Sequence, residues 1–157
     1  MLAIWESGAV FSVQSGRRTG GDQPALANFT GDRSIGSLER RANGVYWFHP
    51  EDLSHFSFPA AGEIGTSGRN AFRGPRHFNT DLALVKRIHF SERGALALRA
   101  EFYNVFNNVN FANPSASLLV PNSFGRIGAT ASGGAGIPVG GTAGGPRIIQ
   151  LVLRYDF

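Results

Sequence analysis

Four polar side chains occur in two pairs, and each pair has the two-residue spacing that puts both members on one face of a β-strand. The pairs are Asn79 with Asp81 and Arg99 with Glu101. Carboxylates held close to a second titratable group are typical of general acid–base catalysis. The same residue types equally form a network of paired charges and amides without a reactive role. The choice between these interpretations depends on the elements that carry the pairs.

No other pattern in the chain indicates catalysis or a cofactor. The chain has no cysteine, and its four histidines, His49, His55, His77 and His89, lack the spacing of metal ligands. The glycine-rich tract at 133–145 lacks the Gly-Lys-Ser/Thr ending of a phosphate-binding loop. Nothing resembles Gly-x-Ser-x-Gly with an arranged triad. We therefore expect no enzymatic activity, no metal and no cofactor, and we interpret the glycine-rich tract as a flexible loop.

Four segments show the alternation of apolar and polar residues that predicts β-strands. They lie near residues 3–14, 78–90, 95–107 and 147–157. Between them, segments 15–76 and 108–146 are rich in glycine and polar residues, and we expect both to be long loops. Residues 91–94, Ser-Glu-Arg-Gly, are expected to form the tight turn of a β-hairpin between the second and third strands.

The last segment alternates most clearly. One side of the expected strand is apolar and ends on a terminal aromatic: Ile149, Leu151, Leu153, Tyr155 and Phe157. In a transmembrane β-barrel, lipid-facing residues alternate with lumen-facing ones, and aromatic side chains lie at the membrane–water interface. No run approaches the ~18 apolar residues of a membrane-spanning helix. The mean hydropathy of −0.10 is compatible with barrel strands, whose alternating signal averages to neutral.

The pattern predicts an all-β fold, namely a fragment of an antiparallel transmembrane β-barrel with two long extracellular loops. Strands of roughly 9–11 residues cross a bilayer, and short turns face the periplasm while long loops face outward. Four strands cannot close a barrel, because the smallest ones need about eight. We therefore expect the chain to be the C-terminal part of a longer protein, an expectation that fits the lack of a visible signal peptide before the first strand.

In a barrel, each strand has a lipid side and a lumen side. The expected lipid-facing residues are Leu82, Leu84, Leu96, Leu98 and Phe102. The polar pairs then face the lumen, where polar side chains are the rule. We therefore interpret Asn79, Asp81, Arg99 and Glu101 as a lumen-facing polar network and not as a catalytic site.

The basic residues are almost all arginines, and they give a net charge of +4 and an isoelectric point near 10.3. They cluster at 17–18, at 40–41 and at positions 69, 73 and 76. A nucleic-acid binder would place such residues on phosphates. In extracellular loops of a barrel, the same arginines meet the phosphates of lipopolysaccharide, an oxyanion that suits the guanidinium group. We expect lipopolysaccharide, and no nucleic acid, as a partner.

Several short motifs, in a fixed order, resemble the end of an Oar-like TonB-dependent outer-membrane receptor. None is diagnostic alone, and the resemblance rests on their order and spacing from about residue 67 to residue 157. The motifs are Gly-Arg-Asn-Ala-Phe-Arg-Gly-Pro at 68–75, Asn-Thr-Asp-Leu-Ala-Leu-Val-Lys at 79–86, Leu-Arg-Ala-Glu-Phe-Tyr-Asn-Val-Phe-Asn at 98–107, Asn-Phe-Ala-Asn-Pro at 110–114, Phe-Gly-Arg-Ile at 124–127 and Pro-Arg-Ile-Ile-Gln at 146–150.

The resemblance implies a barrel of about 22 strands, plugged by an N-terminal domain, that imports scarce nutrients with energy from TonB. This chain would supply the last four strands, covering residues 1–157, without the plug or the TonB-contacting segment. It would not transport alone, and its partners would be the rest of the barrel and the plug. The apolar residues 149, 151, 153, 155 and 157 resemble the C-terminal signal that the barrel-assembly machinery reads by strand addition. Siderophores, cobalamin, oligosaccharides and peptides are all possible substrates.

A soluble β-sandwich that acts in adhesion or carbohydrate binding also gives alternating strands. Its apolar faces would meet in a dry core, whereas a barrel turns its apolar face to lipid. The exposure of that face therefore separates the two classes.

Overall fold

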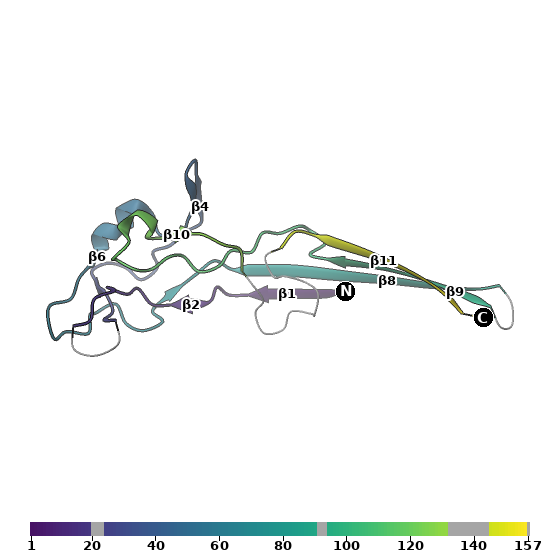
Figure 1. Cartoon of the computed structure of the whole chain (residues 1–157), viewed down its shortest axis with the longest axis horizontal. Helices are drawn as coiled ribbons and strands as arrows, with labels where there is room; N and C mark the ends of the chain where they lie inside the picture. Colours follow the sequence, from purple (N-terminus) through teal and green to yellow (C-terminus); the bar gives the residue numbers. More distant parts are fainter. Residues whose placement is uncertain (20–23, 91–93, 132–144, 157) are drawn as a thin grey trace. The chain divides into compact units, whose positions relative to one another are not determined.

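The structure is a computed structural model that describes residues 1–19, 24–90, 94–131 and 145–156. These residues form β-strands, loops and two short 3₁₀ helices, which confirms the all-β part of the expected fold. Among the described residues, no helix is long and apolar enough to cross a membrane. The chain divides into two compact units (Figure 1). The first unit is Met1–Glu6, His77–Asn110 and Ala131–Phe157, and the second is Ser7–Arg76 and Phe111–Thr130.

The first unit contains one antiparallel sheet of four strands in the order β1-β8-β9-β11. Its strands are β1 (Leu2–Glu6), β8 (His77–His89), β9 (Ala95–Tyr103) and β11 (Ile148–Asp156). In Figure 1, β8, β9 and β11 run side by side as long strands. All three are rich in leucine, valine, isoleucine or aromatic residues, which suit a pleated sheet.

The strand register decides which side chains share a face. Ala100 of β9 pairs with Leu84 of β8 on one side and with Leu151 of β11 on the other. Two residues along, Leu98 pairs with Lys86 and Leu153. Because side chains alternate along each strand and directly paired residues point the same way, this register fixes both faces of the whole sheet.

The connection between β8 and β9 is short, as expected for a hairpin. The amide of Phe90 donates a hydrogen bond of 3.1 Å to the carbonyl of Gly94. The predicted tight turn also includes Ser91, Glu92 and Arg93, which lie outside the described residues.

The first strand is shorter than the sequence predicts. A continuous strand over 3–14 is wrong, because β1 ends at Glu6 and the next strand, β2 (Val10–Phe11), belongs to the second unit. The backbone approaches another segment at Gly8, where an added Cβ would lie 1.8 Å from the carbonyl oxygen of Gly74. This close approach requires glycine and interrupts the extended run.

The third strand is also shorter than predicted. The segment expected at 95–107 ends as a strand at Tyr103, because Asn104 has a φ of 52° and Asn107 a φ of 54°. Asparagine tolerates this left-handed conformation better than most residues. The apolar residues Val105 and Phe106 therefore lie in a turn and not in the sheet.

The second unit contains most of the two segments that the sequence presents as loops. Its elements are β2, β3 (Asn28–Phe29), β4 (Glu39–Arg41), β5 (Gly44–Tyr46), η1 (Pro50–His55), β6 (Phe56–Ser57), β7 (Phe72–Arg73), η2 (Pro121–Ser123) and β10 (Arg126–Ile127). The strands form a three-stranded sheet, β10-β5-β4, and the pairs β2-β7 and β3-β6. Very short strands joined by irregular segments explain why the sequence shows no long periodic pattern here.

Phenylalanines form the core of this unit. Phe48 and Phe72 are fully buried, and Phe11, Phe56 and Phe124 pack around them. The ring centroids of Phe48 and Phe124 lie 5.6 Å apart in a stacked arrangement, and those of Phe48 and Phe72 lie 5.5 Å apart at nearly a right angle. Both arrangements are favourable for aromatic pairs. The part of 15–76 and 108–146 that belongs to this unit, expected from the sequence to form long loops, therefore contains short strands and a packed core.

Candidate functional site

The four-stranded sheet carries the residues that the sequence analysis singled out, and its register separates them into two faces. The predicted lipid-facing residues Leu82, Leu84, Leu96, Leu98 and Phe102 share one face. The predicted polar residues Asn79, Asp81, Arg99 and Glu101 share the opposite face. The strand alternation read from the sequence therefore matches the observed register.

Among the described residues, the polar face contains three separate hydrogen-bonded groups and not one continuous network. In the first, the side-chain amide of Asn79 donates to Oδ1 of Asp81 at 3.0 Å, and the backbone amide of Asn104 donates to the same oxygen at 2.9 Å. Asp81 therefore holds the end of β9 beside β8. The turn residue Asn104 does not have the two-residue spacing of the polar pairs, so the sequence analysis did not identify it.

The second group joins Arg99, Glu101 and Tyr103 on β9. The Nε of Arg99 donates to Oε1 of Glu101 at 2.8 Å, and the hydroxyl of Tyr103 donates to Oε2 at 3.2 Å. Both oxygens of Glu101 are thus occupied by neighbours on its own strand. A carboxylate that accepts hydrogen bonds from an arginine and a tyrosine on its own strand ties their side chains together along one face of β9.

A third charged group lies on the same face near the other end of the sheet. Asp156 accepts a hydrogen bond from Arg87 at 3.0 Å and one from Arg154 at 2.6 Å. It joins β11 to β8, which are separated by β9. Sequence reasoning missed this contact because the partners are 69 residues apart, although Arg154 and Asp156 have the same two-residue spacing as the other pairs.

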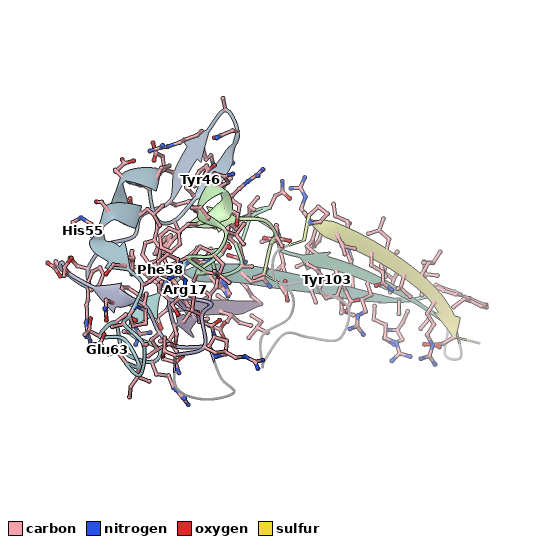
Figure 2. All side chains as sticks on the ribbon, turned by 60° about the vertical axis from the view of Figure 1, so that its left-hand side comes forward. Arg17, Tyr46, His55, Phe58, Glu63 and Tyr103 are labelled. Atoms are coloured by element: carbon pink, nitrogen blue, oxygen red, sulfur yellow. The ribbon has the colours of Figure 1, made fainter. Side chains whose placement is uncertain are left out.

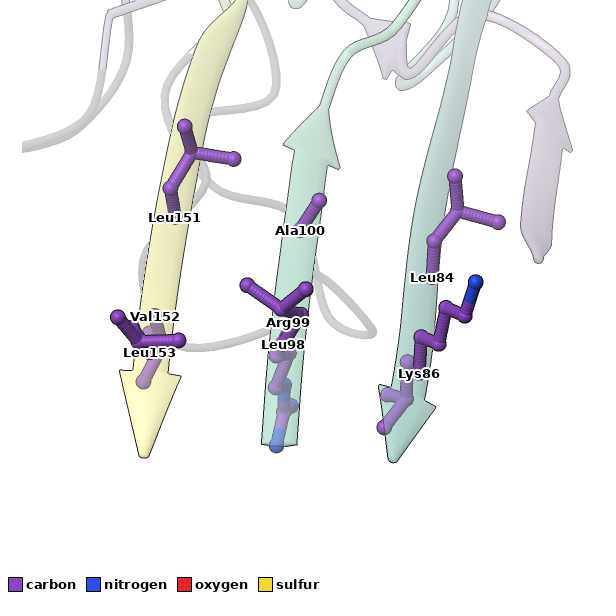
Figure 3. Close-up of a pocket in the computed structure, with 9 residues that line it drawn as sticks. Leu84, Lys86, Leu98, Arg99, Ala100, Leu151, Val152 and Leu153 are labelled. Atoms are coloured by element: carbon purple, nitrogen blue, oxygen red, sulfur yellow. The ribbon is translucent and has the colours of Figure 1, made fainter. Parts of the chain in front are cut away.

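The opposite face is apolar and exposed. Leu151 is 76 % exposed, Leu153 is 64 % and Leu84 is 55 %. Leucines of β8, β9 and β11 surround the small Ala100 and leave a hollow of about 340 Å³ above it (Figure 3). A large exposed apolar patch of this kind marks a surface that interacts with a membrane or with another protein.

Aromatic residues lie near both ends of the apolar face. At one end, the rings of Phe90 and Tyr155 stack with centroids 5.8 Å apart and planes 8° from parallel. At the other end, Phe78 stacks on Phe106 at 6.5 Å, and Trp5 pairs with Phe78 across β1 and β8. Twelve residues from Phe78 to Phe90 span about 40 Å along a strand, or about 30 Å across a bilayer at a tilt near 40°.

The residues of the predicted assembly signal lie on this apolar face. Ile149, Leu151, Leu153 and Tyr155 pair in turn with Phe102, Ala100, Leu98 and Leu96. Phe157, the last member of the predicted signal, lies outside the described residues.

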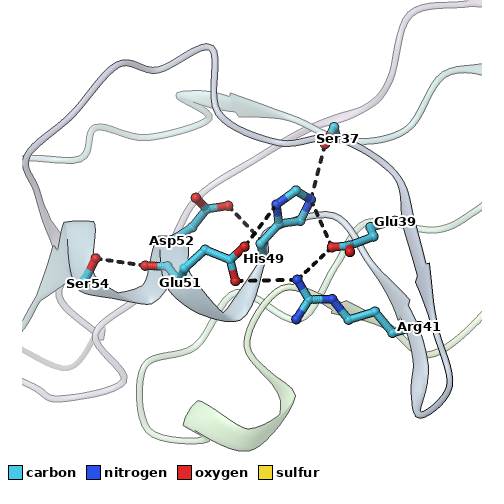
Figure 4. A network of polar contacts seen from close by, with 7 residues as sticks. All are labelled: Ser37, Glu39, Arg41, His49, Glu51, Asp52 and Ser54. Carbon is cyan, nitrogen blue, oxygen red and sulfur yellow. Dashed lines mark hydrogen bonds and ion pairs between the residues drawn. The ribbon is translucent and has the colours of Figure 1, made fainter.

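The second unit has a polar cluster that the sequence analysis did not identify (Figure 4). Arg41 pairs with Glu39 at 2.8 Å and with Glu51 at 3.5 Å. His49 lies 3.4 Å from Glu39 and 3.7 Å from Glu51, and its backbone amide donates to Asp52 at 2.8 Å. The spacing of Glu39 and Arg41 was the available signal. The cluster fixes the β4–β5 hairpin to η1.

The charged groups in this cluster shift one another's pKa values. The hydrogen bond with Glu39 is the main cause that raises the pKa of Arg41 above its ordinary value. The carboxylate of Glu51 accepts a hydrogen bond from its own backbone amide, which lowers the pKa of that carboxyl, and Arg41 lowers it further. Both groups are therefore charged near neutral pH and hold each other in place.

The histidines do not converge. His49 belongs to the cluster above, the Nδ1 of His55 lies 3.0 Å from the carbonyl of Thr30, and His77 lies 3.8 Å from Glu6. His89 is the last residue of β8. Within the described ranges, no group of three or more histidines and carboxylates could hold a metal ion.

Two arginines of the second unit lie on aromatic rings. The guanidinium carbon of Arg17 lies 3.9 Å from the ring centroid of Phe58, a pair labelled in Figure 2, and that of Arg40 lies 5.5 Å from Phe111. These are cation–π distances. The planar guanidinium keeps donors at its edge when it stacks in this way.

An antiparallel sheet with one exposed apolar face, one polar face and aromatic residues near both ends defines a class of protein whose strands cross a membrane. The sequence matches the family of the outer membrane beta barrel domain over residues 1–150. The chain belongs to this family and is an outer-membrane protein. Comparison with curated proteins found no match, and neither did comparison with solved structures.

Proposed function

We propose that this chain forms the last four strands of an Oar-like TonB-dependent receptor of the outer membrane. The receptor takes up a nutrient of the siderophore, cobalamin, oligosaccharide or peptide class. The rest of the barrel, the plug and the segment that contacts TonB come from residues outside this chain. The main support is the order and spacing of the motifs from about residue 67 onward, now joined to a sheet in which the leucines share one face and the paired charges share the other.

The proposed orientation follows from the lengths of the connections. The short link between β8 and β9 faces the periplasm, and the long connections 15–76 and 108–146 face the exterior, as is usual in these barrels. The stacked arginines of the second unit, Arg17 and Arg40, are suited to the phosphates of lipopolysaccharide.

The polar face lines the lumen in this proposal. The side-chain NH₂ of Asn79 donates to Asp81, and Arg99 donates to Glu101. We infer that these four residues hold the wall and do not catalyse a reaction. The apolar face meets lipid through leucines at the middle and aromatic residues near both ends. We propose no enzymatic activity and no nucleic-acid partner.

The last strand is the proposed signal for the barrel-assembly machinery. An exposed strand edge is a template for strand addition, and β11 pairs on one edge only with β9 among the described residues. Ile149, Leu151, Leu153, Tyr155 and Phe157 supply the alternating apolar side.

A soluble β-sandwich for adhesion or carbohydrate binding has less support. Such a fold buries the inner faces of its sheets, whereas Leu151 and Leu153 are largely exposed. Among the residues that the structure describes, no contact favours this second function.

The proposed function is tested with the complete protein encoded at this locus. We expect the purified full-length protein to bind the periplasmic domain of TonB in calorimetry. Deletion of the gene should abolish the same uptake activity as deletion of TonB, within a panel of ferric siderophore, cobalamin, oligosaccharide and peptide. A full-length protein without affinity for TonB, from a gene whose loss changes no uptake, would contradict the proposal.

A further inference from the structure

Lys86 is a charged residue on the apolar face of the sheet, where a barrel strand is expected to carry apolar side chains. It pairs with Leu98, which pairs with Leu153, and along β8 it lies between Leu84 and Ile88. The strand alternation therefore places Lys86 in the apolar row. A lysine on a lipid-facing surface destabilises a barrel by about 2–4 kcal/mol at the bilayer midplane and by much less near the interface.

The other basic residues of the central strands are neutralised, and Lys86 is not. Arg87 and Arg154 pair with Asp156, and Arg99 pairs with Glu101. These three arginines lie on the polar face. Within the part of the chain that the structure describes, no hydrogen bond or ion pair involves Lys86, which is exposed. Its ammonium group is therefore available to an anion that is not among the described residues.

An apolar hollow begins beside this cation. Ala100 forms its floor, between Leu84 and Leu151, and Leu98, Leu153 and Lys86 line the side nearer to Tyr155 (Figure 3). Val85, Arg99 and Val152, whose side chains belong to the opposite face by strand alternation, complete the lining. The volume of about 340 Å³ suits part of an acyl chain. A cation beside an apolar groove has the two features that recognise an anionic lipid, which are a partner for the phosphate and a surface for the chain.

The position of Lys86 along the strand also fits a lipid. It precedes Phe90 by four residues, which is about 13 Å along a strand and about 10 Å along the bilayer normal at a tilt near 40°. An extended lysine stem reaches about 6 Å, so its ammonium can approach the interface. The hollow over Ala100 lies on the other side, toward the bilayer centre, where the acyl chain would run.

We propose that Lys86 and the hollow over Ala100 form a binding site for one anionic phospholipid in the leaflet next to the β8–β9 connection. The ammonium group binds the lipid phosphate, and the hollow takes an acyl chain. The inference rests on the proposed lipid-facing orientation of the sheet, but not on transport or on TonB.

The test uses the full-length protein in vesicles of phosphatidylcholine that contain a minority of phosphatidylglycerol. Lipids that stay bound after extraction are counted by native mass spectrometry. Lys86→Gln should lower the preference for phosphatidylglycerol over phosphatidylcholine about fivefold, the effect of one cation near an anionic surface. Ala100→Leu should fill the hollow and lower retention of both lipids. Arg87→Gln removes the neighbouring charge, which lies on the opposite face. It should change neither the preference for phosphatidylglycerol nor the retention of the two lipids.

Orientation is measured separately, by quenching of an added tryptophan with brominated acyl chains. Quenching of Leu84→Trp but not of Val85→Trp establishes that the apolar face meets lipid. If both are quenched equally, the proposed orientation fails, and the lipid site fails with it. If the orientation holds but Lys86→Gln keeps the same lipid preference, only the lipid site is refuted. A change of oligomeric state in Lys86→Gln with unchanged lipid retention would assign the cation to a protein partner and would also overturn the site.

Discussion

An arginine in place of Leu151 is the most informative single change, because the proposed orientation of the sheet puts Leu151 near the middle of the membrane. Leu151 pairs with Ala100, which pairs with Leu84. Leu84 lies six residues from Phe78 and six from Phe90, the aromatic residues near the two ends of the apolar face. At such a depth, arginine on the lipid side costs about 2–4 kcal/mol, which is a roughly 30- to 900-fold change in the folding equilibrium.

The matched control is Gln150→Arg, one residue earlier on the same strand. Gln150 pairs with Glu101, so the new charge enters the polar face beside a carboxylate. Opposite charges across a strand pair are favourable by a few tenths of a kcal/mol to about 1 kcal/mol. We therefore expect Gln150→Arg to change the stability by less than about 1 kcal/mol.

The assay is urea-dependent folding of the full-length protein into lipid vesicles, followed by tryptophan fluorescence and by the mobility shift of folded barrels on gels. The difference between the two variants is the measured quantity, since it cancels effects of an added arginine in the unfolded chain. Equal destabilisation by both variants, or a larger loss with Gln150→Arg, would refute the assignment of faces.

Three further predictions concern the second unit of the full-length protein. Phe72→Ala should destabilise it by about 3–5 kcal/mol and speed its digestion by a protease, because a fully buried ring is lost. Phe58→Ala, at a partly exposed ring, is the control. Equal rates of digestion for the two variants would contradict the assignment of Phe72 to the core. Gly125→Ala should cost more than about 1 kcal/mol in thermal unfolding, because Gly125 has a φ of 73° and an added Cβ would lie 2.2 Å from the carbonyl of Phe48; an unchanged melting temperature would contradict this. Finally, Asp32 and Glu51 have lowered pKa values, Asp32 mainly through the amide of Ser34 and Glu51 mainly through its own amide. Their contributions are present above the ordinary carboxyl pKa values and are lost as the pH falls through the lowered ones, so acid should loosen this unit, and a pH-independent melting temperature between neutrality and pH ~3 would contradict the reasoning.

The faces of the sheet could be predicted from sequence because the relevant information is local. Side chains alternate with period two along a strand. The sequence alone therefore predicts that Leu82 and Leu84 lie on one side of their strand and that Leu96 and Leu98 lie on one side of theirs. The end of the first strand could not be predicted in this way. It depends on the close approach of Gly8 to Gly74, which are far apart in the chain.

The second unit was missed for a related reason. Its core phenylalanines come from two-residue strands and irregular segments, so no periodic pattern marks Phe48 or Phe72 as buried. The division of the polar face into separate groups was also unpredictable. It depends on the amide of Asn104 reaching Asp81, and this requires the positive φ of a residue whose sequence context suggests a strand.

The contact of Gly8 with Gly74 also has a consequence for the order of folding. β8 and β9 are adjacent in sequence, so their hairpin closes with little loss of chain entropy, whereas β1 must find β8 across about 70 residues. When the intervening segment packs around its phenylalanines, the pairing of β2 with β7 brings its two ends together. The loop that β1 must close to pair with β8 is then effectively short. By the loop-closure relation, this lowers the entropic cost of the pairing by roughly 2–3 kcal/mol compared with a free loop of about 70 residues. Folding of the second unit would thus lower the entropic cost of pairing the N-terminal strand with a hairpin that has already formed.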